Sequence, residues 1–290
     1  KGTGIAGMHG IKPKFGKIIR PLINMRRAEI IAYADHRRIV WREDSSNSET
    51  HYERNFVRHE VMPMLRNLNP NTNEAIANHA ILMQRYEHIL DWITHSVEAK
   101  ISRNPHQGRF TIFNLDLLLE YPEPATLLYH ILRKHGFNYG ICELAIRAET
   151  ESGAQFISGN WALVRDRSTL VFTETQTLHS EEFYEIHETD SAVDVEFGCL
   201  LLSFHEQVDE TDFGKSNVAY LDASNITFPL WVRQVQAGDR FHPLGMQNSK
   251  LASDFFTDTK ASLVARTTSY AIGSNDKILW LAPHRIDDRF

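Results

Sequence analysis

Apolar residues recur at helical spacing through the first half of the chain. From about Asn71 onward they fall three or four positions apart, which predicts one long helix with a continuous apolar stripe. The stripe consists of Ile76, Ala80, Met83, Tyr86, Leu90, Ile93 and Val97. Shorter patterns of the same period predict helices over residues 25–40, 52–61, 124–135 and 143–148. We expect Pro63 to break or restart the second of these helices, and Gly136 to end the third.

The pattern changes period in the second half. Short apolar or alternating runs predict strands at residues 155–158, 161–165, 169–173, 231–236 and 277–283, and residues 174–215 predict edge strands and connections. A helix is expected over residues 249–258 with Ser249 as its cap, and a short buried strand over residues 17–23. The sequence therefore predicts a multidomain α+β fold.

Composition and charge add two constraints. The 290 residues are 42% hydrophobic and 23% charged, as in ordinary globular proteins, and no apolar run approaches the roughly 20 residues that span a bilayer. Residues 1–70 hold 13 Lys and Arg against 7 Asp and Glu, a net charge of +6, whereas residues 174–212 hold 12 Asp and Glu and no Lys or Arg. The basic block suits binding to phosphates, although a solvated charged surface would have the same composition.

Several common motifs are absent or lack their context. Gly2, Gly4 and Gly7 fit G-x-G-x-x-G, but no strand precedes them as a dinucleotide site requires, so we expect a flexible loop. The sequence contains no HExxH, G-x-S-x-G, Walker A or S-G-G-x-D-S motif. Cys142 and Cys199 lie far apart without ligand spacing and are interpreted as two reduced thiols, and no metal site is predicted.

One stretch concentrates candidate chemistry, WREDSSNSETHYERNFVRHEVMPML at residues 41–65. Asp44 lies in a Ser-rich turn that could keep its carboxylate ionised and able to hold an ammonium group. Arg54 and Arg58 are four residues apart on one predicted helical face with Asn55 beside them, an arrangement that suits phosphate or carboxylate recognition. The alternative is structural, with Asp44 or Ser46 as a helix N-cap and the arginines as surface residues.

Four stretches in this order resemble the tRNA(Ile)-lysidine synthase family: KGTGIAGMHGI, IIRPLINMRRAEIIAYA, the stretch at residues 41–65, and GDRFHPLGM…KLASDFFTD…ILWLAPHRIDDRF. The resemblance implies a ligase that uses ATP and Mg²⁺ to attach L-lysine to C2 of the wobble cytidine in a tRNA(Ile) with a CAU anticodon. It implies that Asp44 is catalytic. The substrate or tRNA ligands would be Lys1, Ser46, Asn47, Arg54, Asn55, Arg58, Arg240 and Lys250. A structural alternative for Arg240 is pairing with Asp239 or Asp254.

The resemblance also implies a domain order. Residues 1–65 would be the end of an α/β nucleotide-binding catalytic domain, residues 66–215 a mainly helical substrate-binding domain with a strand-rich end, and residues 216–290 a small α/β domain that contacts tRNA. The family's S-G-G-x-D-S loop is expected before Lys1, so we expect this chain alone to be inactive. We expect a cytoplasmic protein without membrane contact, and a homodimer stays open. Two alternatives remain: a non-catalytic RNA-binding module, and a tRNA thiolase of the same superfamily, which should show reactive cysteines.

Overall fold

The computed structural model describes residues 5–8, 10–42, 53–178, 182–206 and 217–290. Contacts between Cα atoms divide the chain into two compact units, residues 1–93 and 94–290, and each unit has its own character. The architecture is mixed α+β with several antiparallel sheets, as the sequence predicts. None of the helices in the described ranges is long and apolar enough to cross a membrane.

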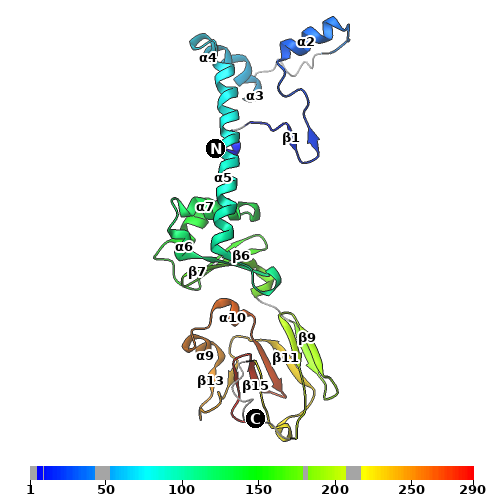
Figure 1. Cartoon of the computed structure of the whole chain (residues 1–290), viewed down its shortest axis with the longest axis vertical. Helices are drawn as coiled ribbons and strands as arrows, with labels where there is room; N and C mark the ends of the chain where they lie inside the picture. Colours follow the sequence, from blue (N-terminus) through cyan, green and yellow to red (C-terminus); the bar gives the residue numbers. More distant parts are fainter. Residues whose placement is uncertain (1–4, 9, 43–52, 179–181, 207–216) are drawn as a thin grey trace. The chain divides into compact units, whose positions relative to one another are not determined.

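The first unit consists of short helices, a small hairpin and most of a long helix (Figure 1). Its elements are α1 (Ile5–Met8), β1 (Lys14–Phe15), β2 (Ile18–Ile19), α2 (Arg27–His36), α3 (Glu53–Phe56), a π turn (Val57–Val61), α4 (Met62–Leu68) and the start of α5 (Thr72–Ile101). The expected buried strand at residues 17–23 is wrong, because β2 pairs only with β1 and Ile19 is 67% exposed. The long helix is confirmed as α5. The Thr72 hydroxyl fixes its start by donating to the carbonyl oxygens of Leu65 (3.0 Å) and Asn69 (2.6 Å).

The first half of the second unit packs helices against one face of an antiparallel sheet. Its elements are the end of α5, β3 (Ser102–Arg103), β4 (Phe110–Asn114), α6 (Leu115–Leu119), α7 (Pro124–Leu132), α8 (Tyr139–Ile146), β5 (Gln155–Ser158), β6 (Trp161–Asp166) and β7 (Thr169–Glu174), with 3₁₀ turns at His106–Gly108, Arg133–His135 and Thr175–Leu178. The strands lie in the order β3-β4-β7-β6-β5, and the three strands predicted at residues 155–173 are confirmed. Gly136 ends the helical run after α7 with φ of +87°, as predicted.

The two faces of this sheet follow from alternation along β7. Leu170 and Phe172 point into the core formed with α6, α7 and α8, whereas Val171 points to the opposite face. There Val171 packs with Phe110, Ile112 and, from α10, Val264. The second face is thus covered by the C-terminal part of the chain.

The C-terminal part is built around a second antiparallel sheet in the order β16-β15-β14-β11-β8. Its elements are β8 (Phe183–Ile186), the hairpin β9 (Ala192–Val195) and β10 (Gly198–Leu201), a 3₁₀ turn (Ala223–Asn225), β11 (Leu230–Gln234), β12 (Arg240–Phe241), β13 (Lys250–Leu251), α9 (Ala252–Asp258), α10 (Leu263–Thr267), β14 (Tyr270–Ser274), β15 (Lys277–Ala282) and β16 (Arg285–Ile286). All described pairs in this sheet are antiparallel, so the expected α/β class for this part is wrong and α+β describes it.

Three local details of the C-terminal part concern the start of α9, the glycine in β14 and the place of β8. Ser249 does not cap the FFTD helix, because α9 begins at Ala252 with Leu251 in the capping position and without a side-chain cap. A Cβ atom on Gly273 would lie 2.0 Å from Cζ2 of Trp231, so only glycine allows the Trp231 ring to lie against β14. β8 belongs to this sheet although it precedes residue 215, and the division at residues 65 and 215 stays a prediction.

Candidate functional site

The Arg-Asn-x-x-Arg segment lies on one helical run made of α3, the π turn and α4. Residues Phe56, Val61 and Met62 at the junctions all have right-handed helical backbone angles, so the run is continuous. Arg54 and Arg58 are both exposed, whereas Asn55 is only 6% exposed. The segment therefore offers two guanidinium groups to solvent and directs the amide of Asn55 inward.

Pro63 accounts for the π turn. A proline has no N–H to donate, and its ring would clash with the carbonyl group four residues earlier, at His59. The widened turn relieves this clash, and the N–H of Met62 donates to the carbonyl oxygen of Val57, five residues back. The prediction that Pro63 breaks or restarts the helix is confirmed in its second form, since α4 starts at Met62 with Pro63 in its first turn, while the helical run itself is not broken. Such π turns are frequent at functional sites.

The other predicted residues of this region lie outside the described residues. These are Lys1, Asp44, Ser46 and Asn47. Their roles stay predictions, as do those of Arg54, Asn55 and Arg58.

Two ion pairs tie the basic block to α5. Nζ of Lys12 lies 2.8 Å from Oε2 of the nearly buried Glu87, and Nη2 of Arg26 lies 3.0 Å from Oε1 of Glu74 on the surface. Arg20 also donates to the carbonyl oxygen of Lys12 at 3.1 Å. These contacts neutralise part of the positive charge of this segment and give it a fixed path along the helix.

The predicted C-terminal ligands lie on two paired strands. Arg240 is in β12 and Lys250 in β13, which form a small antiparallel pair, so Lys250 precedes the FFTD helix rather than starting it. Arg240 is exposed and Nη1 donates to Oγ of Ser249 at 3.2 Å, while Lys250 forms an ion pair with Asp258. The alternative partner Asp239 is bound by Arg233 through two hydrogen bonds of 2.8 Å. Arg240 and Lys250 thus both keep N–H donors for a ligand, although the charge of Lys250 is already paired with that of Asp258.

A buried carboxylate holds the loop that follows β12. Asp287 has no exposed surface and accepts hydrogen bonds from the N–H of His242 (2.8 Å) and from Nε and Nη2 of Arg289 (2.8 and 2.9 Å). Burial alone raises the pKa of Asp287, but the hydrogen bonds from Arg289 and His242 outweigh it and hold that pKa below its usual value. The HRIDDRF motif at the end of the chain therefore has a structural function, which is to fix the GDRFHPLGM loop.

The pKa values of both cysteine thiols are raised. Burial raises the pKa of the Cys142 thiol to about 12, and a hydrogen bond with Asp194 raises the pKa of the Cys199 thiol. Because the thiolate is the nucleophile, neither side chain is activated at neutral pH. Within the described ranges, no three His, Cys, Asp or Glu side chains are grouped so that they could hold a metal ion.

The sequence patterns gave no indication of a polar cluster at the junction of the two sheets. Arg109 forms an ion pair with Glu196 and lies over the ring of Phe197, 5.3 Å from its centroid, and Asp166 accepts from the N–H of Leu263 at 2.7 Å. These partners are 87 and 97 residues apart in the chain, so no local spacing could reveal them.

Comparison with known proteins assigns the class. A family model described as a PP-loop domain matches residues 1–65, and one described as the TilS substrate binding domain matches residues 106–175. Together with the mixed α+β fold, these matches define a protein that carries part of a PP-loop ATP-binding domain followed by a substrate-binding domain.

Relatives narrow the class to one family. The whole chain is similar to the tRNA(Ile)-lysidine synthases of Parabacteroides distasonis (31% identity), Bacteroides thetaiotaomicron (30%) and Porphyromonas gingivalis W83 (30%). The chain belongs to the tRNA(Ile)-lysidine synthase family, and the resemblance in its motifs is confirmed. It spans less than two thirds of these relatives, namely 65%, 64% and 65% of their lengths.

Proposed function

We propose that the gene product containing this chain joins L-lysine to a tRNA(Ile) in an ATP-dependent reaction, in the cytoplasm. The observation that carries this proposal is similarity to tRNA(Ile)-lysidine synthases over the entire chain, including both the Arg-Asn-x-x-Arg segment and the GDRFHPLGM loop. The bond formed would link the lysine side-chain nitrogen to C2 of the wobble cytidine in the CAU anticodon.

The proposed reaction has two steps. The C2 carbonyl oxygen of the cytidine first attacks the α-phosphate of ATP, and pyrophosphate leaves. The lysine side-chain amine then attacks C2, loses a proton, and AMP leaves with the former carbonyl oxygen. Mg²⁺ would accompany ATP by screening its phosphates, and the proposal assigns no residue of the described ranges to it.

The residues divide into two roles in this proposal. Arg54 and Arg58 are exposed on the same helical run and can bind tRNA or nucleotide phosphates through their guanidinium groups. Asn55 is buried, so we assign it the task of holding the run rather than a direct contact with tRNA. Asp44 would orient the lysine amine, with Ser46, Asn47 and Lys1 as neighbouring ligands.

The direct test is lysine incorporation into tRNA(Ile) by the full-length gene product. Arg54→Ala combined with Arg58→Ala should lower turnover by about 10²-fold or more, because two positioned charge-assisted contacts are lost. Arg66→Ala is a matched control, since Arg66 is an exposed arginine in α4 of the same helical run. Equal activity of the double variant and the control would remove the assigned role from the Arg-Asn-x-x-Arg segment.

Two further measurements separate this function from its alternatives. A non-catalytic RNA-binding module would bind tRNA but support no tRNA-dependent exchange of pyrophosphate into ATP, which the adenylation step requires. A thiolase would lose activity when its cysteines are replaced. The raised pKa values of Cys142 and Cys199 argue against that chemistry, and Cys142→Ala with Cys199→Ser should leave lysine transfer unchanged.

A further inference from the structure

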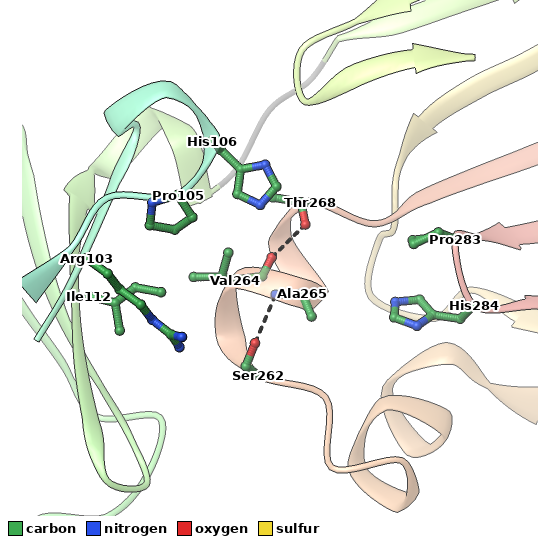
Figure 2. Close-up of a pocket in the computed structure, with 10 residues that line it drawn as sticks. All are labelled: Arg103, Pro105, His106, Ile112, Ser262, Val264, Ala265, Thr268, Pro283 and His284. Atoms are coloured by element: carbon green, nitrogen blue, oxygen red, sulfur yellow. Dashed lines mark hydrogen bonds between the residues drawn. The ribbon is translucent and has the colours of Figure 1, made fainter. Parts of the chain in front are cut away.

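A cavity of about 370 Å³ lies in the second unit between the sheet of β3–β7 and helix α10. Arg103, His106 and Ile112 line one wall, and Ser262, Val264 and Thr268 line the other (Figure 2). Its volume is within the range of about 300–1,000 Å³ that is usual for small-molecule sites. None of the matched family domains covers both walls, since the substrate-binding match ends at residue 175.

Three polar groups of this cavity, those of Arg103, His106 and Ser262, are donors with spare capacity. Two others are engaged: the Thr268 hydroxyl donates to the carbonyl oxygen of Val264 at 2.9 Å, and the His284 ring is hydrogen-bonded to Ser269 at 2.8 Å. Within the described ranges the Arg103 guanidinium forms no hydrogen bond or ion pair, and neither ring nitrogen of His106 forms a hydrogen bond. Figure 2 shows Arg103 and His106 approaching from the sheet side and Ser262 from the helix side. Oγ of Ser262 accepts a hydrogen bond from the N–H of Ala265 at 3.2 Å, so the hydroxyl proton of Ser262 can donate to another group.

The lining of the cavity carries no negative charge. No carboxylate lines it, and the two carboxylates at the junction of the sheets each have a partner: Asp166 accepts a hydrogen bond from the N–H of Leu263, and one oxygen of Glu196 pairs with Arg109. The Arg103 charge is therefore not neutralised by a neighbour. A cavity with a guanidinium, an imidazole and a hydroxyl, and without a carboxylate, is suited to a phosphate group.

The remaining wall is apolar. Ile112 and Val264 are nearly buried, and Pro105 and Pro283 complete this surface. The His106 ring is held edge-on between the rings of Phe110 and Phe197, with centroids 5.9 Å away in both cases. A ligand that carries only a phosphate would leave this surface uncovered, whereas a flat ring attached to the phosphate would cover it.

We propose that this cavity binds a free nucleoside monophosphate, with its phosphate held by Arg103, His106 and Ser262 and its base against the apolar wall. The site lies in the second unit, whereas the Arg-Asn-x-x-Arg segment belongs to the first, and the proposal does not depend on the lysine-transfer proposal. No covalent step is assigned to it.

The test is calorimetric titration of the full chain with AMP, with inorganic phosphate as the second probe. We expect saturable AMP binding that Arg103→Ala weakens at least tenfold and Arg103→Lys weakens less, because a charge-assisted hydrogen bond is typically worth that factor. Inorganic phosphate should bind more weakly than AMP. Arg147→Ala is the matched control, since Arg147 is an exposed arginine that pairs with Glu143 at 3.3 Å, and it should leave AMP binding unchanged.

Three results would overturn the proposal. The first is the absence of saturable AMP binding at millimolar concentration. The second is equal affinity in the native chain and in Arg103→Ala, which would mean that AMP binds elsewhere. The third is that Arg103→Ala weakens the binding of a short RNA hairpin but not the binding of AMP, which would assign the cavity to RNA. Circular dichroism of each variant ensures that lost binding does not reflect lost folding; Arg103 is exposed and outside the hydrophobic core.

Discussion

The two units differ in what they bury. In residues 94–290 the interior contains large apolar side chains such as Phe113, Leu128, Leu163 and Phe241, each with almost no exposed surface. In the described part of residues 1–93, the buried side chains are those of Asn55, Thr72 and Glu87, all of them polar. The unit that carries the recognisable motif thus has no apolar core among its described residues, whereas the unit with the cores carries few motif residues.

The part of the chain that should contribute most to stability is thus different from the part that carries the proposed chemistry. Hydrophobic burial is the dominant favourable contribution to folding, so the free energy of unfolding measured on this chain should come mainly from residues 94–290. The motif unit is held instead by the start of α5, the hydroxyl of Thr72 and the ion pair of Lys12 with Glu87. Substitutions in the two units should therefore have very different effects on stability.

The largest expected effect comes from a matched pair of phenylalanines. Phe113 is 1% exposed and Phe15 is 69% exposed. Phe113→Ala should reduce the free energy of unfolding by about 3–5 kcal/mol through lost burial and a new cavity. Phe15→Ala should change it by less than about 0.5 kcal/mol. Urea unfolding followed by circular dichroism measures both, and equal losses would show that Phe15 is packed in solution.

Asp287→Asn should lower the free energy of unfolding by about 2 kcal/mol at neutral pH, because the hydrogen bonds from Arg289 would then go to a neutral amide instead of a carboxylate. The pKa of Asp287 is lowered in the folded protein, so its contribution is complete above the unfolded value of about 3.9 and disappears as pH falls through the folded value. The stability difference between the native chain and the variant should therefore narrow below about pH 4. A difference independent of pH would mean that Asp287 stabilises the loop by shape alone.

A third comparison asks whether the C-terminal part shares tRNA binding with the basic block. If Arg240 and Lys250 contact phosphates, Arg240→Ala with Lys250→Ala should weaken tRNA binding about tenfold and reduce the slope of log affinity against log salt by roughly 0.7–0.9 per contact. Filter binding at several salt concentrations measures this. An unchanged slope would assign phosphate binding to the N-terminal block, and Lys277→Ala, an exposed lysine on β15, is the control.

The smallest effects concern the two ion pairs on α5. Lys12→Ala should lower the free energy of unfolding by about 1 kcal/mol, because it removes the ion-pair partner of the nearly buried carboxylate of Glu87. Arg26→Ala should cost less than about 0.5 kcal/mol, because Arg26 and Glu74 are both exposed. The two variants are compared by the urea midpoint at constant slope. A larger loss for Arg26→Ala would contradict the burial difference.

Local sequence signals predicted where helices lie better than they predicted which side chains are buried. The spacing of apolar residues located α5, and Gly136 located the end of the α7 run, because both depend on neighbours within a few residues. Burial of the segment around Ile18 was mispredicted, since it depends on whether another layer covers the strand. The π turn was missed because the effect of Pro63 depends on how the rest of the run adapts.

The candidate sites show the same limit. The Arg-Asn-x-x-Arg segment is contiguous and could be found by its motif, but the inward direction of Asn55 required the structure. Arg103 and Ser262 lie 159 positions apart in the sequence and line one cavity only through the packing of α10 on the β3–β7 sheet. No periodicity or motif connects such residues before the chain is folded.

The π turn at Val57–Val61 also has a consequence for deletions in the sequences of relatives. In an α-helix each residue turns the chain by about 100°, and a π turn accommodates one residue more than an α-helical turn. A single-residue deletion within 57–61 would therefore return this turn to ordinary α-helix and bring back the clash between Pro63 and the carbonyl group four residues earlier. The same deletion would leave Arg54 on nearly the same side of the helical run relative to α4, because the extra residue of a π turn is taken up within a single turn. We therefore expect relatives with a gap at this point to lack Pro63 while keeping this arginine on the same helical face.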